Sequence, residues 1–348
     1  ARPAGAALAV ELCQCGAGSG QRDGAAGHHH GLRVGADVLS WPPFAAHRLA
    51  AGADVHYRRS DGKTSLLLIS APGDATMLDL LLAAGADPQA VDRDGESLLL
   101  IAAERGFASL IQPLIQTGAT IDLQNHDGWT PLIAATAARQ SEIVSALLEA
   151  GADPNLQSQD RETALHLAAI EGDVDVIRLL LGRGAKTDVI TSLGDTPLVL
   201  ATLHEHTAAV AAILESGIDL SAHQQGVTAF GLAIVDRYSE IAQLLLAAGV
   251  SPIQTFKDGQ TPLMICATQG NLELVRSLIA AGAEIDLQDD TGATALMWAT
   301  HRQHQEMIEF LLSVGANHTS KNHGGLTALD LAQMNGNRKV IDLLTKIV

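Results

Sequence analysis

Two thiols and three imidazoles near the N-terminus are the residues best suited to metal chemistry. Cys13 and Cys15 precede the run His28–His30, and thiolates and imidazoles are preferred zinc ligands. Their spacing matches no zinc-site pattern, and the Ala- and Gly-rich composition around them is typical of a tail. We therefore expect no metal site, and a metal-binding regulator is the least favoured class of function.

Residues for catalysis are not grouped in any recognisable way elsewhere in the sequence. His166 has no evident nucleophile or carboxylate beside it that would make it a general base. The segment Gly16–Gly20 is rich in glycine, but it lacks the preceding strand and the following helix that a phosphate-binding loop requires. We expect no catalytic residues, no cofactor and no enzymatic activity.

Composition and charge narrow the class of partner. The 348 residues are 47% hydrophobic but only 3% aromatic, which suits thin repeated layers of aliphatic side chains better than one deep core. The net charge is −17, and residues 61–348 carry 16 basic against 35 acidic side chains. Such a surface repels phosphate backbones, so we expect no nucleic-acid binding and favour a protein partner with a basic patch.

Cysteine content and hydropathy indicate the cellular setting. Three cysteines do not make a disulfide framework, so we expect a reducing compartment, the cytoplasm. No apolar run approaches the roughly 18 residues of a membrane span, so we expect no membrane association.

One pattern recurs along most of the chain. Successive units start 33 residues apart, with one interval of 32, and a fixed period of about 20–50 residues indicates a repeat architecture. The starts are Asp61, Asp94, Asp127, Asp160, Leu193, Gln225, Asp258, Thr291 and Gly324.

The unit that starts at Asp127 shows the local chemistry of a repeat. After a turn, the Thr130 hydroxyl can cap a helix, and Pro131 occupies the first helical position, where no N–H is needed. A second helix carries an apolar stripe that includes Leu147, and Gly151 ends it. Helices shorter than roughly 12–15 residues are marginal alone in water, so each unit must stack on the next.

The same positions recur in the other units. The capping residue is always a hydroxyl residue: Thr64, Ser97, Thr130, Thr163, Thr196, Thr228, Thr261, Thr294 and Thr327. Glycine ends the second helix at Gly85, Gly118, Gly151, Gly184, Gly217, Gly249, Gly282 and Gly315. Cys266 occupies a position that other units fill with alanine, so we interpret it as a small buried thiol.

The segments DGWTPL (127–132), TALHLAA (163–169) and GNLELVRSLIAAGAEID (270–286) resemble the motifs of the ankyrin-repeat family. The resemblance implies an all-α solenoid of antiparallel helix pairs with β-turn fingers. It also implies a structural hydrogen-bonding role for His166 and turn-capping roles for His206 and His304. Trp298 stands where other units have leucine, so we interpret it as core filling.

The resemblance and the repeat spacing together predict the domain organisation. We expect a poorly ordered tail at residues 1–40, a degenerate N-terminal cap at 41–60, eight repeats at 61–323 and a capping repeat at 324–348. The repeat from Leu193 is the short one and has Glu205 where a turn glycine is usual, so we expect the weakest layer there. Pro113 falls within a predicted second helix and predicts a bend or a late start.

Members of the family usually bind partners through finger tips and the exposed side of the first helix. Packing leaves those positions free, and here they combine apolar residues with an acidic rim, as protein-binding patches do. The predicted partner-binding residues are Trp129, Glu162, Ile170, Glu171, Asp195, Leu203, His204, Val235, Asp236, Gln260, Gln269, His301 and Arg302. His204 and His301 could make binding sensitive to pH.

The expected function is therefore that of a monomeric protein-interaction scaffold or adaptor without catalysis. The alternative is a targeting or regulatory segment of a larger enzyme or channel.

Overall fold

Pairs of short helices joined by loops make up the described part of the chain. The computed structural model describes residues 49–50, 53–69, 75–218, 220 and 224–345, which contain seventeen α-helices and no strand longer than an isolated bridge. The chain divides into two compact units, Ala1–Asp153 and Pro154–Val348. The predicted all-α repeat solenoid is confirmed, whereas the expected tail at residues 1–40 and half of the expected cap at 41–60 lie outside the described residues.

The first helices of the repeats follow the 33-residue period. They are α4 (Leu98–Arg105), α6 (Pro131–Ala137), α8 (Ala164–Glu171), α10 (Pro197–Leu203), α12 (Gln224–Val235), α14 (Pro262–Gln269), α16 (Ala295–His301) and α18 (Ala328–Met334). The second helices are α3 (Ala75–Ala83), α5 (Ala108–Gln116), α7 (Ser141–Glu149), α9 (Val174–Gly182), α11 (Thr207–Glu215), α13 (Ser239–Ala247), α15 (Leu272–Ala280), α17 (Gln305–Ser313) and α19 (Arg338–Thr345).

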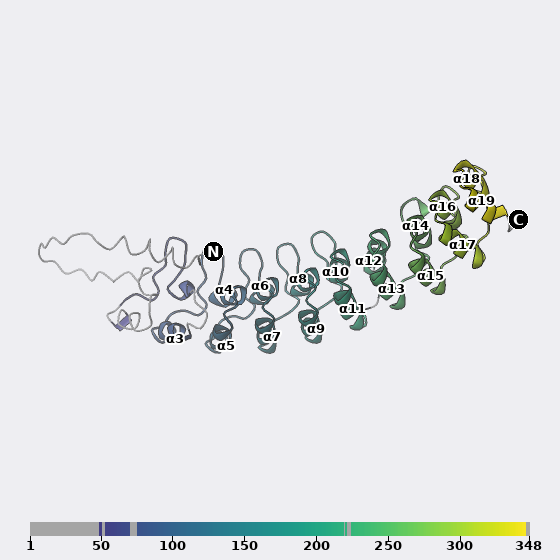
Figure 1. The fold of residues 1–348 in the computed structure, drawn as a ribbon. Helices are drawn as coiled ribbons and strands as arrows, with labels where there is room; N and C mark the ends of the chain where they lie inside the picture. The colour runs from purple at the N-terminus through teal and green to yellow at the C-terminus, as the bar shows by residue number, and fades with distance from the viewer. Residues whose placement is uncertain (1–48, 51–52, 70–74, 219, 221–223, 346–348) are drawn as a thin grey trace, which may run out of the picture. The chain divides into compact units, whose positions relative to one another are not determined.

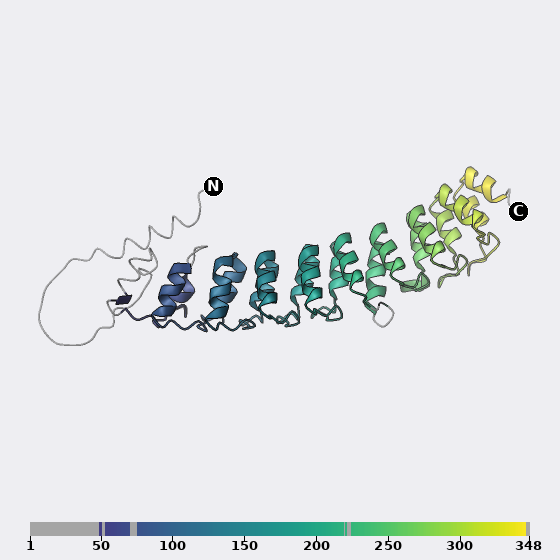
Figure 2. The same ribbon diagram turned by 90° about the horizontal axis from the view of Figure 1, so that it is seen from below.

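Stacking of equivalent helices buries the apolar stripes within each unit. In the first unit α4 packs on α6 and α5 on α7, and in the second unit α8 packs on α10 and α9 on α11, with the later pairs continuing the pattern. Figure 1 shows first helices in one row and second helices in another within each unit, with loops projecting on the side of the first helices. Figure 2 shows the connecting loops at one end of the helices. Each layer thus presents a first helix and its preceding loop, which we call the finger, on the same side.

Hydroxyl caps start most of the first helices, as predicted. The Thr130 hydroxyl accepts from the Ile133 N–H at 3.1 Å, and the Ser97 hydroxyl accepts from the Leu100 N–H at 3.2 Å. The glycines that end the second helices have positive φ angles, for example +95° at Gly151, as a left-handed terminus requires.

Short polar side chains shape the fingers. Asn125 Oδ1 accepts from the Asp127 and Trp129 N–H groups, and Asp289 Oδ1 accepts from Thr291 and Ala293 in the same way. Adjacent fingers within a unit are joined by backbone hydrogen bonds, for example His126 N–H to the Asp94 carbonyl at 2.9 Å. Neighbouring fingers are therefore linked by their backbones as well as by the packing of the helices that follow them.

Two local expectations require correction, and a third is narrowed. Of the bend or late start predicted at Pro113, the late start is excluded, because α5 has the same nine-residue span as α7 one period later. The bend stays a prediction. Thr228 does not cap its helix: α12 starts at Gln224, so Thr228 lies inside it and the finger predicted there is replaced by helix. The first helix predicted after Thr64 is, within the described residues, a 3₁₀ turn, η2 (Leu66–Leu68), which ends because Ile69 has an extended backbone.

The turn of the repeat from Leu193 has a residue other than glycine in the left-handed region, and that this layer is the weakest stays a prediction. Glu205 adopts a φ of +58°, in the left-handed region, between α10 and α11. Gly172 occupies the equivalent position one repeat earlier with a φ of +68°. Glu205 therefore bears a conformational cost that glycine avoids at this position.

Candidate functional site

Cys266 and His166 are both buried structural residues. Cys266 is 0% exposed in α14, and burial raises the pKa of its thiol to about 12, so the reactive thiolate is scarce at neutral pH. His166 is also 0% exposed; its Nδ1 accepts from the Thr163 N–H at 3.1 Å and its Nε2 donates to the Val189 carbonyl at 3.1 Å. Both ring nitrogens are therefore used within the fold, as predicted for His166.

Metal and small-molecule sites find little support in the described residues. Within that part of the chain no three His, Cys, Asp or Glu side chains are grouped as ligands, and Cys13, Cys15 and His28–His30 lie outside it.

None of the helices in the described residues has the length and apolar character needed to cross a bilayer.

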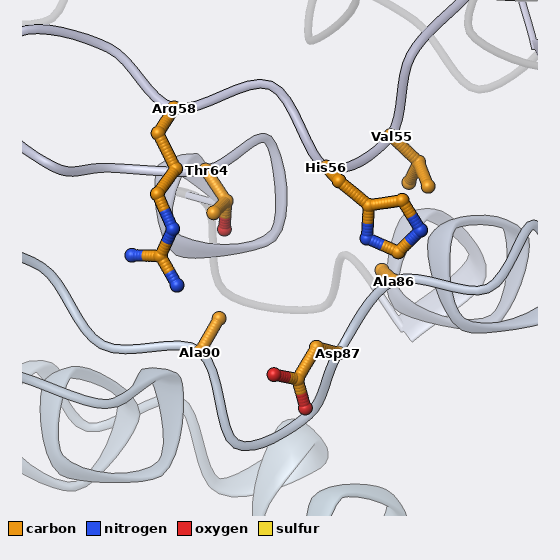
Figure 3. A pocket seen from close by; sticks show the side chains of 7 residues that line it. All are labelled: Val55, His56, Arg58, Thr64, Ala86, Asp87 and Ala90. Atoms are coloured by element: carbon orange, nitrogen blue, oxygen red, sulfur yellow. The ribbon is translucent and has the colours of Figure 1, made fainter.

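A small cavity in the first unit is shown in Figure 3. It has a volume of about 70 Å³ beside Arg58, His56 and Asp87, which is room for a few water molecules. Arg58 Nη1 donates to the Val91 carbonyl at 2.6 Å and to the Gly62 carbonyl at 3.3 Å. The guanidinium therefore ties neighbouring loops together, and the cavity offers no room for an organic substrate.

The predicted partner-binding residues are divided between the two units. Trp129 belongs to the first unit and is half-buried at its finger, where its backbone N–H donates to Asn125 Oδ1 at 2.8 Å. The other twelve belong to the second unit. Glu171, Leu203, His204, Val235, Asp236, His301 and Arg302 are exposed, and Glu162, Ile170, Asp195, Gln260 and Gln269 are half-buried.

The apolar members of the set occupy equivalent positions in successive layers. Leu203 is the last residue of α10 and is 47% exposed, and Val235 is the last residue of α12 and is 55% exposed. Helix α10 packs on both α8 and α12, so these ends lie in consecutive layers, and Ile170 is next to the end of α8. The structure thus places these three residues in adjacent layers.

Acidic side chains accompany this apolar row. Glu171 ends α8 and Asp236 follows α12, and both are exposed. Burial, and then the neighbouring Asp160, raise the pKa of the Glu162 carboxyl in the finger before α8. A positively charged group placed beside Glu162 would stabilise its ionised form.

Gln269 has a structural role that the sequence pattern did not indicate. Its Nε2 donates at 3.1 Å to the carbonyls of Ile234 and Val235, which close the first helix of the preceding repeat. Arg237 in turn donates to the Gln269 carbonyl. Packing therefore does not leave position 269 free, and its role in partner binding stays a prediction.

Histidines perform the same task where the turn residue is glycine. His206 Nε2 donates to the Ile170 carbonyl at 2.8 Å, and His304 Nε2 donates to the Thr268 carbonyl at 3.0 Å. The turn-capping roles implied for both residues are confirmed. His204 stacks on His206, with ring centroids 6.1 Å apart. A partner that touches His204 would therefore lie close to the hydrogen bond between His206 and the Ile170 carbonyl.

Several exposed apolar residues were missed in the sequence. Leu193 is 87% exposed at a finger tip, Met334 is 73% exposed at the end of α18, and Ile190 and Ile253 are 40% and 44% exposed. A leucine at the finger position that is aspartate in five units was a usable signal for Leu193.

The repeated caps, fingers and stacked helix pairs define an ankyrin-repeat solenoid. Family models described as ankyrin repeats match residues 66–158, 150–224, 220–289 and 263–347, and the chain belongs to this family. The human ASB11 ankyrin repeat domain is similar, with 28% identity and a TM-score of 0.52, over 63% of this chain and 97% of that one.

An ankyrin repeat domain from Acinetobacter baumannii AYE is similar as well. It shares 31% identity, with a TM-score of 0.50, over 53% of this chain and 98% of its own length. No curated protein matches the sequence significantly. Ankyrin repeats are generally protein-interaction modules, so the exposed first-helix ends are candidate contacts for a protein partner.

Proposed function

We propose that this chain is a monomeric, cytoplasmic scaffold or adaptor that binds a protein partner on its finger and first-helix side, without catalysis. The observation that carries the proposal is the exposure of Leu203 and Val235 at equivalent helix ends. Folding normally removes such side chains from water, and covering them with a partner would gain roughly 25 cal/mol for each Å² buried.

The chemistry around these residues indicates the kind of partner. We define the docking patch as Ile170, Glu171, Leu203, Val235 and Asp236, all in the second unit. Its centre is aliphatic and its exposed charges are carboxylates. Protein interfaces usually have apolar residues at the centre and, around them, charged residues that face opposite charges on the partner. The partner should therefore present aliphatic and basic side chains together.

The net charge of −17 supports the same partner chemistry. A predominantly acidic surface attracts basic partners over distances up to a Debye length and increases their association rate. Glu162 and Asp195 extend the acidic character into the fingers that precede α8 and α10. Binding should therefore weaken as salt is raised.

The proposal is tested by reversing two charges of the docking patch. Glu171→Lys combined with Asp236→Lys should weaken a captured partner about tenfold or more, because each reversed exposed charge is worth roughly 1 kcal/mol. Glu284→Lys combined with Glu309→Lys is the control, because it changes net charge equally at exposed residues of a loop and a second helix.

Partners are first captured from extract by the wild type and identified by quantitative mass spectrometry, and their dissociation constants are then measured. Equal melting temperatures of the two double variants establish that both are folded. If every partner bound both variants as tightly as the wild type, the docking patch would not be the interface.

A further inference from the structure

A cavity between two adjacent repeats lies outside the docking patch. It has a volume of about 190 Å³ and is lined by residues of α16, α18 and their fingers in the second unit. Figure 1 shows α16 and α18 next to each other. Met297, Trp298 and Leu331 form its apolar walls, and His301, Thr291 and Asn322 supply polar groups. Apolar cavities of about 150 Å³ hold a benzene-sized molecule, so this one has room for one large side chain.

Trp298 forms a fixed wall of this cavity. Its indole Nε1 donates to Asp289 Oδ2 at 2.8 Å, while Asp289 Oδ1 accepts from Thr291 and from the Ala293 N–H. The His301 ring meets the indole edge-on, with centroids 6.2 Å apart and planes at 86°. Two independent contacts therefore hold the indole plane before any partner arrives.

Asp289 gives the indole an anionic neighbour. The carboxyl is 6% exposed; burial raises its pKa, but hydrogen bonds from Thr291, Ala293 and Trp298 outweigh burial and lower it below the ordinary value. Donation to a carboxylate makes the indole face more electron-rich. An aromatic face with this polarity attracts a cation within about 6 Å of its centre.

Trp298 is half-buried and lines the cavity, as Leu331 does at the same position of the next repeat. Leu167 is half-buried at this position as well, whereas Leu200 is buried at 8% exposure. The interpretation of Trp298 as core filling is therefore incomplete, because part of its ring remains available to a visiting group.

Asp289 supplies the carboxylate that contacts the aromatic wall of the cavity. It stands on the finger before α16 and accepts from the Trp298 indole, whereas Asp290 lies against Gly259 of the preceding finger. Arg302 follows His301 at the end of α16, and Lys321 on the next finger interacts electrostatically with Asp330. The aromatic wall is therefore backed by a negative charge, which suits a basic occupant.

We propose that the Trp298 cavity holds an arginine side chain of the protein partner. The guanidinium would stack on the indole, its methylene stem would lie along Met297 and Leu331, and acceptor atoms of Asn322 and His301 lie at the cavity. The inference rests on the proposed docking function and adds a second contact, distinct from the docking patch.

The test uses the full chain labelled with ¹⁵N-tryptophan and three acetylated, amidated pentapeptides. All have alanine at the four other positions, and the central residue is arginine, citrulline or leucine. Citrulline keeps the shape of arginine but removes the charge. The Trp298 indole resonance is assigned from its absence in Trp298→Leu, a variant that carries the residue of equivalent repeats.

The arginine peptide should shift the Trp298 indole resonance saturably and bind about five- to thirtyfold more tightly than the citrulline peptide. Trp298→Leu should lose that preference while its melting temperature shows that it remains folded. A leucine peptide that binds as tightly as the arginine peptide, or no shift with any peptide, would overturn the proposal. The two proposals can fail separately. Trp298→Leu changes this cavity and leaves the docking patch unchanged, whereas the Glu171→Lys and Asp236→Lys variant changes the docking patch and leaves this cavity unchanged.

Discussion

The imidazole of His206 lies against Gly172 and donates a hydrogen bond to the Ile170 carbonyl, 2.8 Å away in the preceding repeat. A Cβ atom at Gly172 would approach the His206 ring to 2.6 Å. The absence of a side chain at Gly172 in one repeat therefore makes room for the His206 ring of the next repeat, which caps the turn. The stability of the array depends on this pairing as well as on its apolar core.

Gly172→Ala should destabilise the second unit more than Gly184→Ala. Both glycines have positive φ angles, so both substitutions carry a strain of about 1–2 kcal/mol, but nothing lies within 4 Å of a Cβ at Gly184. The additional loss at Gly172 should shrink when His206 is also alanine, as urea unfolding of the double variant would show. Equal effects of the two glycine substitutions would contradict the close packing at His206.

Glu205→Gly should stabilise the repeat that starts at Leu193. The left-handed φ of +58° strains glutamate but not glycine, so the free energy of unfolding should rise by about 1 kcal/mol. Glu205→Ala is the control, because alanine keeps the backbone strain while removing the carboxylate. A gain of equal size in both variants would assign the effect to the carboxylate.

Pro113→Ala should stabilise the first unit by about 1–3 kcal/mol, measured by thermal or urea unfolding. Proline inside α5 has no N–H to donate to the Ser109 carbonyl, and alanine restores that donor. Pro262→Ala is the matched control at the first position of α14, where the N–H is not needed. No gain from Pro113→Ala would mean that α5 accommodates proline without cost.

The stability of the second unit should fall as pH drops through the range in which an exposed histidine titrates. Burial, opposed by the Val189 and Asp195 contacts, lowers the pKa of His166 below 6.5. Below pH 6.5 the unfolded chain binds a proton that the folded chain resists, so the contribution of neutral His166 is complete above that pH and decreases below it.

The measurement is the free energy of unfolding between pH 7.5 and 5.5, compared with that of His166→Asn. The variant cannot titrate there, so its pH dependence should be smaller than that of the wild type. Identical pH profiles would show that other histidines cause the effect.

The sequence was sufficient for features that depend on a few neighbouring residues. Hydroxyl caps, second-helix glycines and the span of each second helix follow from local geometry, which is why Thr130 and Gly151 behave as predicted. Thr228 shows the limit of such reasoning. Its repeat follows the one that is a residue short, and α12 starts at Gln224, four residues before the hydroxyl that was expected to cap it.

The candidate site was less predictable because its positions also serve contacts between repeats. The repeat pattern predicts a free surface residue at Gln269, yet its side chain reaches two carbonyls that lie 34 and 35 residues earlier. The leucines at equivalent positions indicate core filling for Trp298, yet its ring is half-buried and lines a cavity between two layers. Both outcomes depend on distances between repeats that no single repeat encodes.

Photocrosslinking tests the docking proposal most directly. A photoreactive phenylalanine analogue replaces Leu203, Val235 or, as the control, Glu309 on a second helix, and each protein is irradiated with its captured partner. We expect crosslinks from positions 203 and 235 and none from 309. Crosslinks from position 309 alone would place the partner on the second helices and contradict docking at the first-helix ends.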